Sequence, residues 1–126
     1  MFNVESKTGA NQLTKFVSNT PILQSADYMF YGCTNLEHLY MDFSNIPNYN
    51  MSQIFGYDSY NCTKLNVASL ECIADTIQWG DYHDLYIGIN GSLQYDNGDG
   101  EYQKCQDALS RIRNKGWSVY EIYSNN

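Results

Sequence analysis

Apolar and polar residues alternate in the stretch DLYIGIN, residues 84–90. This alternation is typical of a β-strand with one buried face, because successive side chains of a strand point to opposite sides. Upstream, the stretch LEHLYM has the spacing L-x-x-L-x-L, which turns Leu36, Leu39 and Met41 to one face. Both stretches are therefore predicted to be strands whose aliphatic side chains fill a core.

Two other stretches carry apolar residues at helical spacing. The stripe of the first is Leu70, Ile73, Ala74 and Ile77. The stripe of the second is Tyr102, Cys105, Leu109 and Ile112. We predict that the first helix starts at an N-cap provided by Ser69 and stops at Gly80, and that Gly116 is the left-handed C-cap of the second. The chain then ends in WSVYEIY, which is predicted to be an aromatic strand.

The chain also contains an internal similarity, between Ser25–Leu39 and Asn50–Leu70. The matched pairs are Phe30 with Phe55, Cys33 with Cys62, Thr34 with Thr63 and Leu36 with Leu65. The matched phenylalanines are 25 residues apart. Leucine-rich repeats have a period of roughly 20–29 residues, so this spacing favours stacked repeat units of that kind.

Composition and charge narrow the class of protein. The 126 residues fit one domain and include 12 Tyr, a side chain favoured at interfaces because it combines a ring with a hydroxyl. The formal net charge of −7 disfavours general binding to nucleic acid. No apolar run is long enough to span a membrane, and the N-terminal residues have no signal-peptide pattern. The four widely spaced cysteines are expected to be reduced and buried.

The stretches MFYGCTNLEHLYMDFSN and NMSQIF resemble the BspA-like leucine-rich repeats of gut Bacteroidetes and their phages. The ending ADTIQ…DLYIGIN…ALSRIRNKGWSVY is similar to the C-terminal segment that follows such repeats, with Lys115, Gly116, Trp117 and Val119 matching its Lys-Gly-Trp-x-Val strand. The resemblance implies a single α/β domain over residues 1–126, built as a short leucine-rich-repeat solenoid with a helix–strand C-terminal cap. Residues 25–67 would be the repeats and 68–126 the C-terminal turns and cap, while 1–24 would form a degenerate first turn.

The resemblance also implies recognition or scaffolding, and it carries over no catalytic residue, metal or cofactor. We therefore expect a non-catalytic protein-interaction module, associated with a phage virion or accessory to it, present in the virion or in the host cytoplasm before assembly. Its partner would be another virion subunit. The alternative is a secreted or lipid-anchored adhesin at the cell surface, which binds a host protein or a glycan.

The binding face would be the side of the strands that points away from the aliphatic core. Its predicted residues are His38, Tyr40, Asp42, Tyr86 and Asn90. Tyr40 and Tyr86 are the strongest candidates among the tyrosines, because strand alternation places both on this face.

Three stretches offer chemical alternatives. Cys33 and His38 could form a nucleophile–base pair, but the matched Cys62 has no histidine at the same offset, so packing is favoured. His83, between two acids in DYHDL, could be part of a metal site, although three or four convergent ligands are required and a surface loop is preferred. The stretch YDNGDGE fails the EF-hand spacing in either register and is predicted to be a turn that leads into the last helix.

Overall fold

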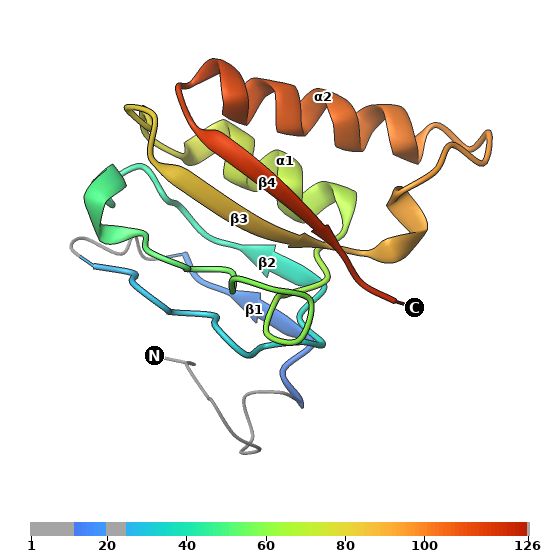
Figure 1. Ribbon diagram of the computed structural model, residues 1–126, viewed down its shortest axis with the longest axis horizontal. Helices are drawn as coiled ribbons and strands as arrows, with labels where there is room; N and C mark the ends of the chain where they lie inside the picture. Colours follow the sequence, from blue (N-terminus) through green and yellow to red (C-terminus); the bar gives the residue numbers. More distant parts are fainter. Residues whose placement is uncertain (1–11, 20–24, 126) are drawn as a thin grey trace.

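The computed structural model describes residues 12–19 and 25–125. Its elements in chain order are β1 (Lys15–Val17), β2 (His38–Tyr40), the 3-10 helix η2 (Asn48–Asn50), α1 (Val67–Thr76), β3 (Asp84–Ile89), the 3-10 helix η3 (Gly91–Leu93), α2 (Glu101–Asn114) and β4 (Ser118–Tyr123). The labelled strands follow one another across the molecule in the order β1, β2, β3, β4, with their arrows pointing the same way (Figure 1). α2 lies next to β4, at the end of the molecule away from β1.

These strands form two parallel pairs. β1 pairs with β2 in the register that places Phe16 beside Leu39. β3 pairs with β4 over six residues, with Tyr86 beside Tyr120. Parallel neighbours cannot be joined by a tight hairpin, so the chain between β3 and β4 crosses over through α2.

A short segment, residues 64–66, connects the two sheets. On one side, the N–H groups of Lys64 and Asn66 donate to the carbonyls of Leu36 and Glu37, both at 2.9 Å. On the other side, Leu65 forms a parallel bridge with β3: its N–H donates to the Gly88 carbonyl at 2.9 Å, and its carbonyl accepts the N–H of the residue after β3 at 3.0 Å. This segment is followed directly by α1.

The predicted leucine-rich-repeat solenoid is wrong. The described part of the chain has two α-helices and two two-stranded parallel sheets, and no series of equivalent solenoid turns. The leucine spacing was misleading because burial alone does not require a repeat unit. Leu36, Leu39 and Met41 are buried as expected, but of the three only Leu39 lies in β2, and the other two lie in the segments that flank it. After Leu65 the chain enters α1 and then a strand–helix–strand unit, where a further repeat would have required another turn like the first two.

The two similar stretches nevertheless lie side by side. The N–H groups of Ala26, Tyr28 and Phe30 donate to carbonyls at positions 50, 52 and 54, at 2.8–2.9 Å. Tyr28 and Gln53, which are 25 positions apart, both have a positive φ, of 60° and 47°. Of the first turn expected for residues 1–24, the described residues 12–19 contribute β1, and the rest lies outside the described residues.

The helices bury the predicted apolar stripes except for Tyr102, which is only partly buried. In α2, Cys105, Leu109 and Ile112 are fully buried, and Gly116 follows the helix with φ +87°, as its expected left-handed position requires. In α1 the stripe from Leu70 to Ile77 is buried as well. The predicted cap is wrong, however, because α1 starts at Val67 with Asn66 as its N-cap, and Ser69 lies inside the helix.

The segment after α2 contacts the end of α1 through the motif residues Lys115, Gly116 and Trp117. The Lys115 ammonium group donates to two carbonyls at the end of α1, those of Ala74 and Ile77, at 2.6 and 2.9 Å. The Trp117 indole packs on Gly80, where an added Cβ would lie 2.5 Å from the ring. Gly80 therefore serves this close contact and does not end α1, which is already complete at Thr76.

Ser69 ties α1 to β2 and gives the first testable prediction. Its Oγ accepts the N–H of Leu39 at 2.8 Å, and the side chain is completely buried. Replacing Ser69 with alanine leaves that buried N–H unpaired, so Ser69→Ala should lower the free energy of unfolding by about 1–3 kcal/mol in a urea titration.

The matched control is Ser110→Ala, at an exposed position of α2. It should change the free energy of unfolding by less than about 0.5 kcal/mol. Equal effects of the two substitutions would contradict a stabilising role for the Ser69 hydroxyl.

Candidate functional site

His38 and Tyr40 lie together on β2, where the side chain of Asn66 contacts both. The Asn66 Oδ1 accepts the backbone N–H of Ser69 at 3.0 Å, which fixes the orientation of the amide. Its Nδ2 therefore donates to His38 Nδ1 at 3.1 Å and lies 3.5 Å from the Tyr40 hydroxyl. Because Nδ1 accepts, the neutral His38 ring carries its proton on Nε2, which lies 3.9 Å from a carboxylate oxygen of Glu37.

Glu37 extends this network to the neighbouring strands. Its Oε1 lies 3.5 Å from Asn90 Nδ2 and 3.9 Å from the Lys64 ammonium group. The structure thus brings His38, Tyr40 and Asn90 close to one another, as members of one network. Many of the polar atoms of this network already form hydrogen bonds or ion pairs within the protein.

The other two predicted binding residues lie elsewhere. Asp42 is in the turn after β2, where hydrogen bonds from the side chain and then the backbone of Ser44 lower the pKa of its carboxyl group. The backbone N–H of Ser44 donates to Asp42 Oδ1 at 2.8 Å. This carboxylate caps a local turn. Tyr86 lies on β3, on the face opposite to the buried side chains of that strand.

Tyr86 is the centre of a row of three rings, which we call the tyrosine row: Tyr57, Tyr86 and Tyr120. The Tyr86 ring stacks on Tyr120, with centroids 4.7 Å apart and an interplanar angle of 17°. On its other side, the Tyr57 ring lies 4.8 Å away, tilted by 57°. The outer two rings are about half exposed, at 48% and 47%. Desolvation, followed by the neighbouring Tyr57 and Asp84, raises the pKa of the Tyr86 hydroxyl.

An open groove of about 320 Å³ runs beside the tyrosine row. Its lining residues are Tyr28, Ser52, Gln53, Tyr57, His83, Asp84 and Tyr86. His83 Nδ1 donates to the Gly80 carbonyl at 2.9 Å, because a carbonyl can only accept. The lining of the groove combines the aromatic rings of tyrosines with the carboxylate of Asp84.

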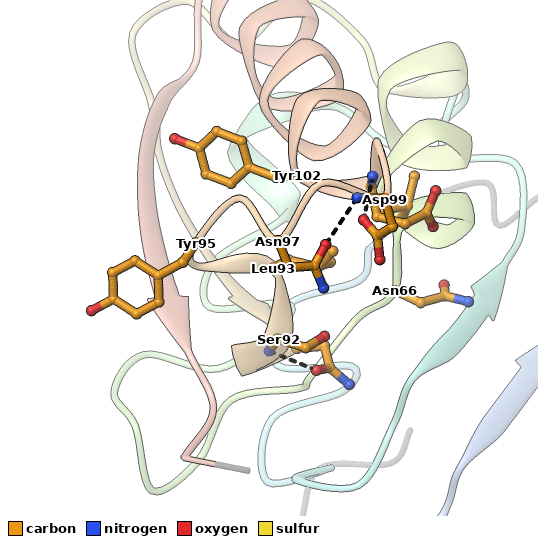
Figure 2. A pocket seen from close by; sticks show the side chains of 10 residues that line it. Asn66, Ser92, Leu93, Tyr95, Asn97, Asp99 and Tyr102 are labelled. Atoms are coloured by element: carbon orange, nitrogen blue, oxygen red, sulfur yellow. Dashed lines mark hydrogen bonds between the residues drawn. The ribbon is translucent and has the colours of Figure 1, made fainter.

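A second, smaller pocket lies where β3 and the 64–66 segment end and both α-helices begin. This carboxyl-edge pocket measures about 150 Å³ and is lined by Asn66, Val67, Asn90, Ser92, Leu93, Tyr95, Asn97, Asp99, Glu101 and Tyr102. Tyr95 and Tyr102 extend to one side of it, and Asn66 lies on the other side (Figure 2). Parallel strand–helix units commonly bind ligands at this edge of a sheet.

The stretch YDNGDGE forms part of the wall of this pocket, as the turn that was predicted to lead into the last helix. Three side chains in it each accept a backbone N–H two residues on: Asp96 from Gly98, Asn97 from Asp99, and Asp99 from Glu101, at 2.9–3.1 Å. Gly98 and Gly100 have φ of +91° and +85°, which only glycine adopts without strain. These turns hold the side chains that line the pocket.

The chemical alternatives find little support in the geometry. The His38 ring is hydrogen-bonded to Tyr40 and Asn66. Burial raises the pKa of the Cys33 thiol to about 11, so the thiolate that a nucleophile needs is scarce at neutral pH. Across residues 12–19 and 25–125, no three His, Cys, Asp or Glu side chains converge as a metal site would require.

Sequence reasoning missed two features of these surfaces. It overlooked Asn66, although asparagine is among the most favourable N-cap residues, because Ser69 stood closer to the apolar stripe. It also did not place Tyr57 and Tyr120 against Tyr86. The pairing of Tyr86 with Tyr120 depends on strand register across an intervening helix, which local alternation does not reveal.

Comparisons with known proteins do not assign a family. No protein-family profile, no curated protein and no solved structure matches this chain. In the part of the chain that the structure describes, no helix has both the length and the apolar character needed to cross a membrane.

The buried thiols predict how stability depends on pH. Burial raises the pKa of Cys33 and Cys105 to about 11 and that of Cys62 to about 12, from an ordinary value of 9.0. The unfolded chain therefore loses these protons first, and the stability that they confer is complete below about pH 9 and declines as pH rises toward 11. Urea titrations across this range should show that Cys33→Ala makes the decline shallower, by about 1.4 kcal/mol per pH unit.

Cys72 supplies the matched control, because it is only partly buried. Cys72→Ala should alter the pH slope less than Cys33→Ala does. An unchanged slope in Cys33→Ala would mean that its thiol ionises in the folded protein as readily as in the unfolded chain.

Proposed function

We propose that this protein is a recognition module that binds a protein partner through the tyrosine row, without a chemical step. The observation that carries the proposal is the contact of the Tyr86 ring with a tyrosine ring on each side. Rings held in this way lose little conformational freedom on binding and offer a large amphipathic contact area. Aromatic residues of this kind are enriched at the centres of protein interfaces.

Charge indicates the chemistry of the partner. The chain carries a formal net charge of −7, and the Asp84 carboxylate lies beside the central ring of the row and in the groove. A segment with arginine or lysine side chains would complement this carboxylate. The same side chains could lie over the exposed tyrosine rings as cation–π contacts. The proposed partner is therefore a protein segment that combines basic and apolar side chains.

The proposal moves the binding face away from the one first expected. His38, Tyr40 and Asn90 bond to one another through Asn66 and Glu37, which leaves fewer of their polar atoms for a partner. The tyrosine row keeps Tyr86 from the original set and adds Tyr57 and Tyr120. A place in a virion or on a cell surface stays a prediction from the sequence.

A selection from a random displayed-peptide library tests the proposed partner. Peptides enriched on this protein should contain arginine or lysine next to apolar residues. Tyr86→Leu should weaken binding of the best such peptide by at least about fivefold in a titration, because it removes the central ring while keeping an apolar side chain. Replacing the arginine of the peptide with uncharged citrulline should weaken binding to the original protein as well.

Tyr49→Leu is the matched control, since Tyr49 is 68% exposed and lies outside the row and the groove. It should bind the peptide as the original protein does. Enrichment of acidic peptides, or equal binding by Tyr86→Leu and the original protein, would refute the proposal.

A further inference from the structure

The carboxyl-edge pocket has the volume of a small ring. It measures about 150 Å³, and a cavity of about that size admits a single six-membered carbon ring. The buried side chains of Val67 and Leu93 supply the apolar part of its lining. Tyr95 and Tyr102 also line the pocket, with their rings directed away from Asn97 and Asp99 (Figure 2).

The lining disfavours ions of either sign. Asp99 and Glu101 are the charged residues among those that line the pocket, and no lysine, arginine or histidine is among them. Glu101 is paired with Lys104, 3.4 Å away and outside the lining, so an anion would meet the Asp99 carboxylate with no cationic side chain in the lining to balance it. A divalent metal ion would need more oxygen ligands than these, and the described residues hold no group of three acidic, His or Cys side chains suited to a metal.

Several polar atoms at the pocket make no hydrogen bond within the described residues. Asn97 uses its Oδ1 for the N–H of Asp99, which leaves its Nδ2 as a donor. Asp99 uses its Oδ1 for the N–H of Glu101, which leaves its Oδ2 as an acceptor. The hydroxyls of Ser92, Tyr95 and Tyr102 add groups that both donate and accept. A hydroxyl group of a ligand also donates and accepts, so it could use both the Asp99 oxygen and the Asn97 amide.

We propose that the carboxyl-edge pocket binds one neutral, polyhydroxylated six-membered ring, that is, a pyranose sugar. The ring fits the volume, its C–H groups suit the aliphatic surface of Val67 and Leu93, and its hydroxyls suit the free carboxylate and amide groups. The sugar is either a free monosaccharide or the terminal residue of a glycan, since both present the same ring. This site is separate from the tyrosine row and does not depend on it.

The test is an NMR titration of the ¹⁵N-labelled protein with methyl glycosides and free forms of common hexoses and N-acetylhexosamines. A small neutral ligand in an open pocket binds weakly, with a dissociation constant of about 1–10 mM. At least one sugar should shift the amide signals of residues 90–102 in a saturable manner, whereas calcium chloride and inorganic phosphate should not. Binding of the methyl glycosides would indicate a glycan end, and binding of the free sugars alone would indicate a monosaccharide.

Asp99→Asn is the decisive variant, because asparagine keeps the acceptor for the N–H of Glu101 and replaces the free acceptor with a donor. This substitution should weaken the affinity for the sugar by about two- to tenfold. Asp96→Asn is the matched control, because Asp96 makes the same kind of turn with Gly98 but does not line the pocket. The affinity of this variant for the sugar should be unchanged.

Three results would overturn this inference: no saturable shift with any sugar, shifts with calcium or phosphate alone, or equal binding by Asp99→Asn and Asp96→Asn. Tyr86→Leu should bind the sugar normally. Loss of peptide binding in that variant with sugar binding intact would show that the two sites act separately.

Discussion

The rest of the structure depends on the hydrogen bonds that residues 64–66 make on both of their sides. They join β2 to β3, and they place the first turn of α1 directly after the sheet. The approach is so close that a Cβ on Gly88 would lie 2.1 Å from the Thr63 carbonyl oxygen. Asn66 makes three kinds of contact at this point. Its backbone N–H donates to the Glu37 carbonyl, its side-chain oxygen caps α1, and its side-chain nitrogen contacts His38 and Tyr40.

The parallel direction of the strands then separates the two candidate surfaces. Where 64–66 and β3 end, the chain turns into α1 and into the η3 loop before α2, so polar turn residues gather at one edge and line a pocket. The face of β3 and β4 that bears Tyr86 and Tyr120 is set by strand alternation, since Leu85 and Ile87 point into the core. The pocket is therefore lined largely by turn and helix-start residues, whereas the tyrosine row is centred on two strand residues, Tyr86 and Tyr120, with Tyr57 added from a bend.

Local patterns in the sequence predicted the individual elements well and their assembly poorly. Alternation located β3, and helical spacing located α2 together with its glycine at position 116, because both patterns arise from burial within one element. The leucine-rich-repeat solenoid was wrong because buried leucines in a strand do not specify what covers them. The tyrosine row and the carboxyl-edge pocket each combine residues from segments far apart in the chain, so no short stretch contains the information that brings them together.

The motif on which the resemblance depended shows why a recognisable stretch need not be a functional one. Lys115 is occupied by two carbonyls at the end of α1, and the Trp117 indole donates to the Gln78 carbonyl at 2.8 Å while packing on Gly80. A side chain at Gly116 would lie 2.9 Å from the Trp79 ring, so glycine is needed there for space as well as for its φ. The distinctive spacing of this motif is thus explained by the junction of two helices and a strand. The surfaces proposed for recognition consist instead of tyrosine rings and turn side chains, which the fold holds in place but does not itself require.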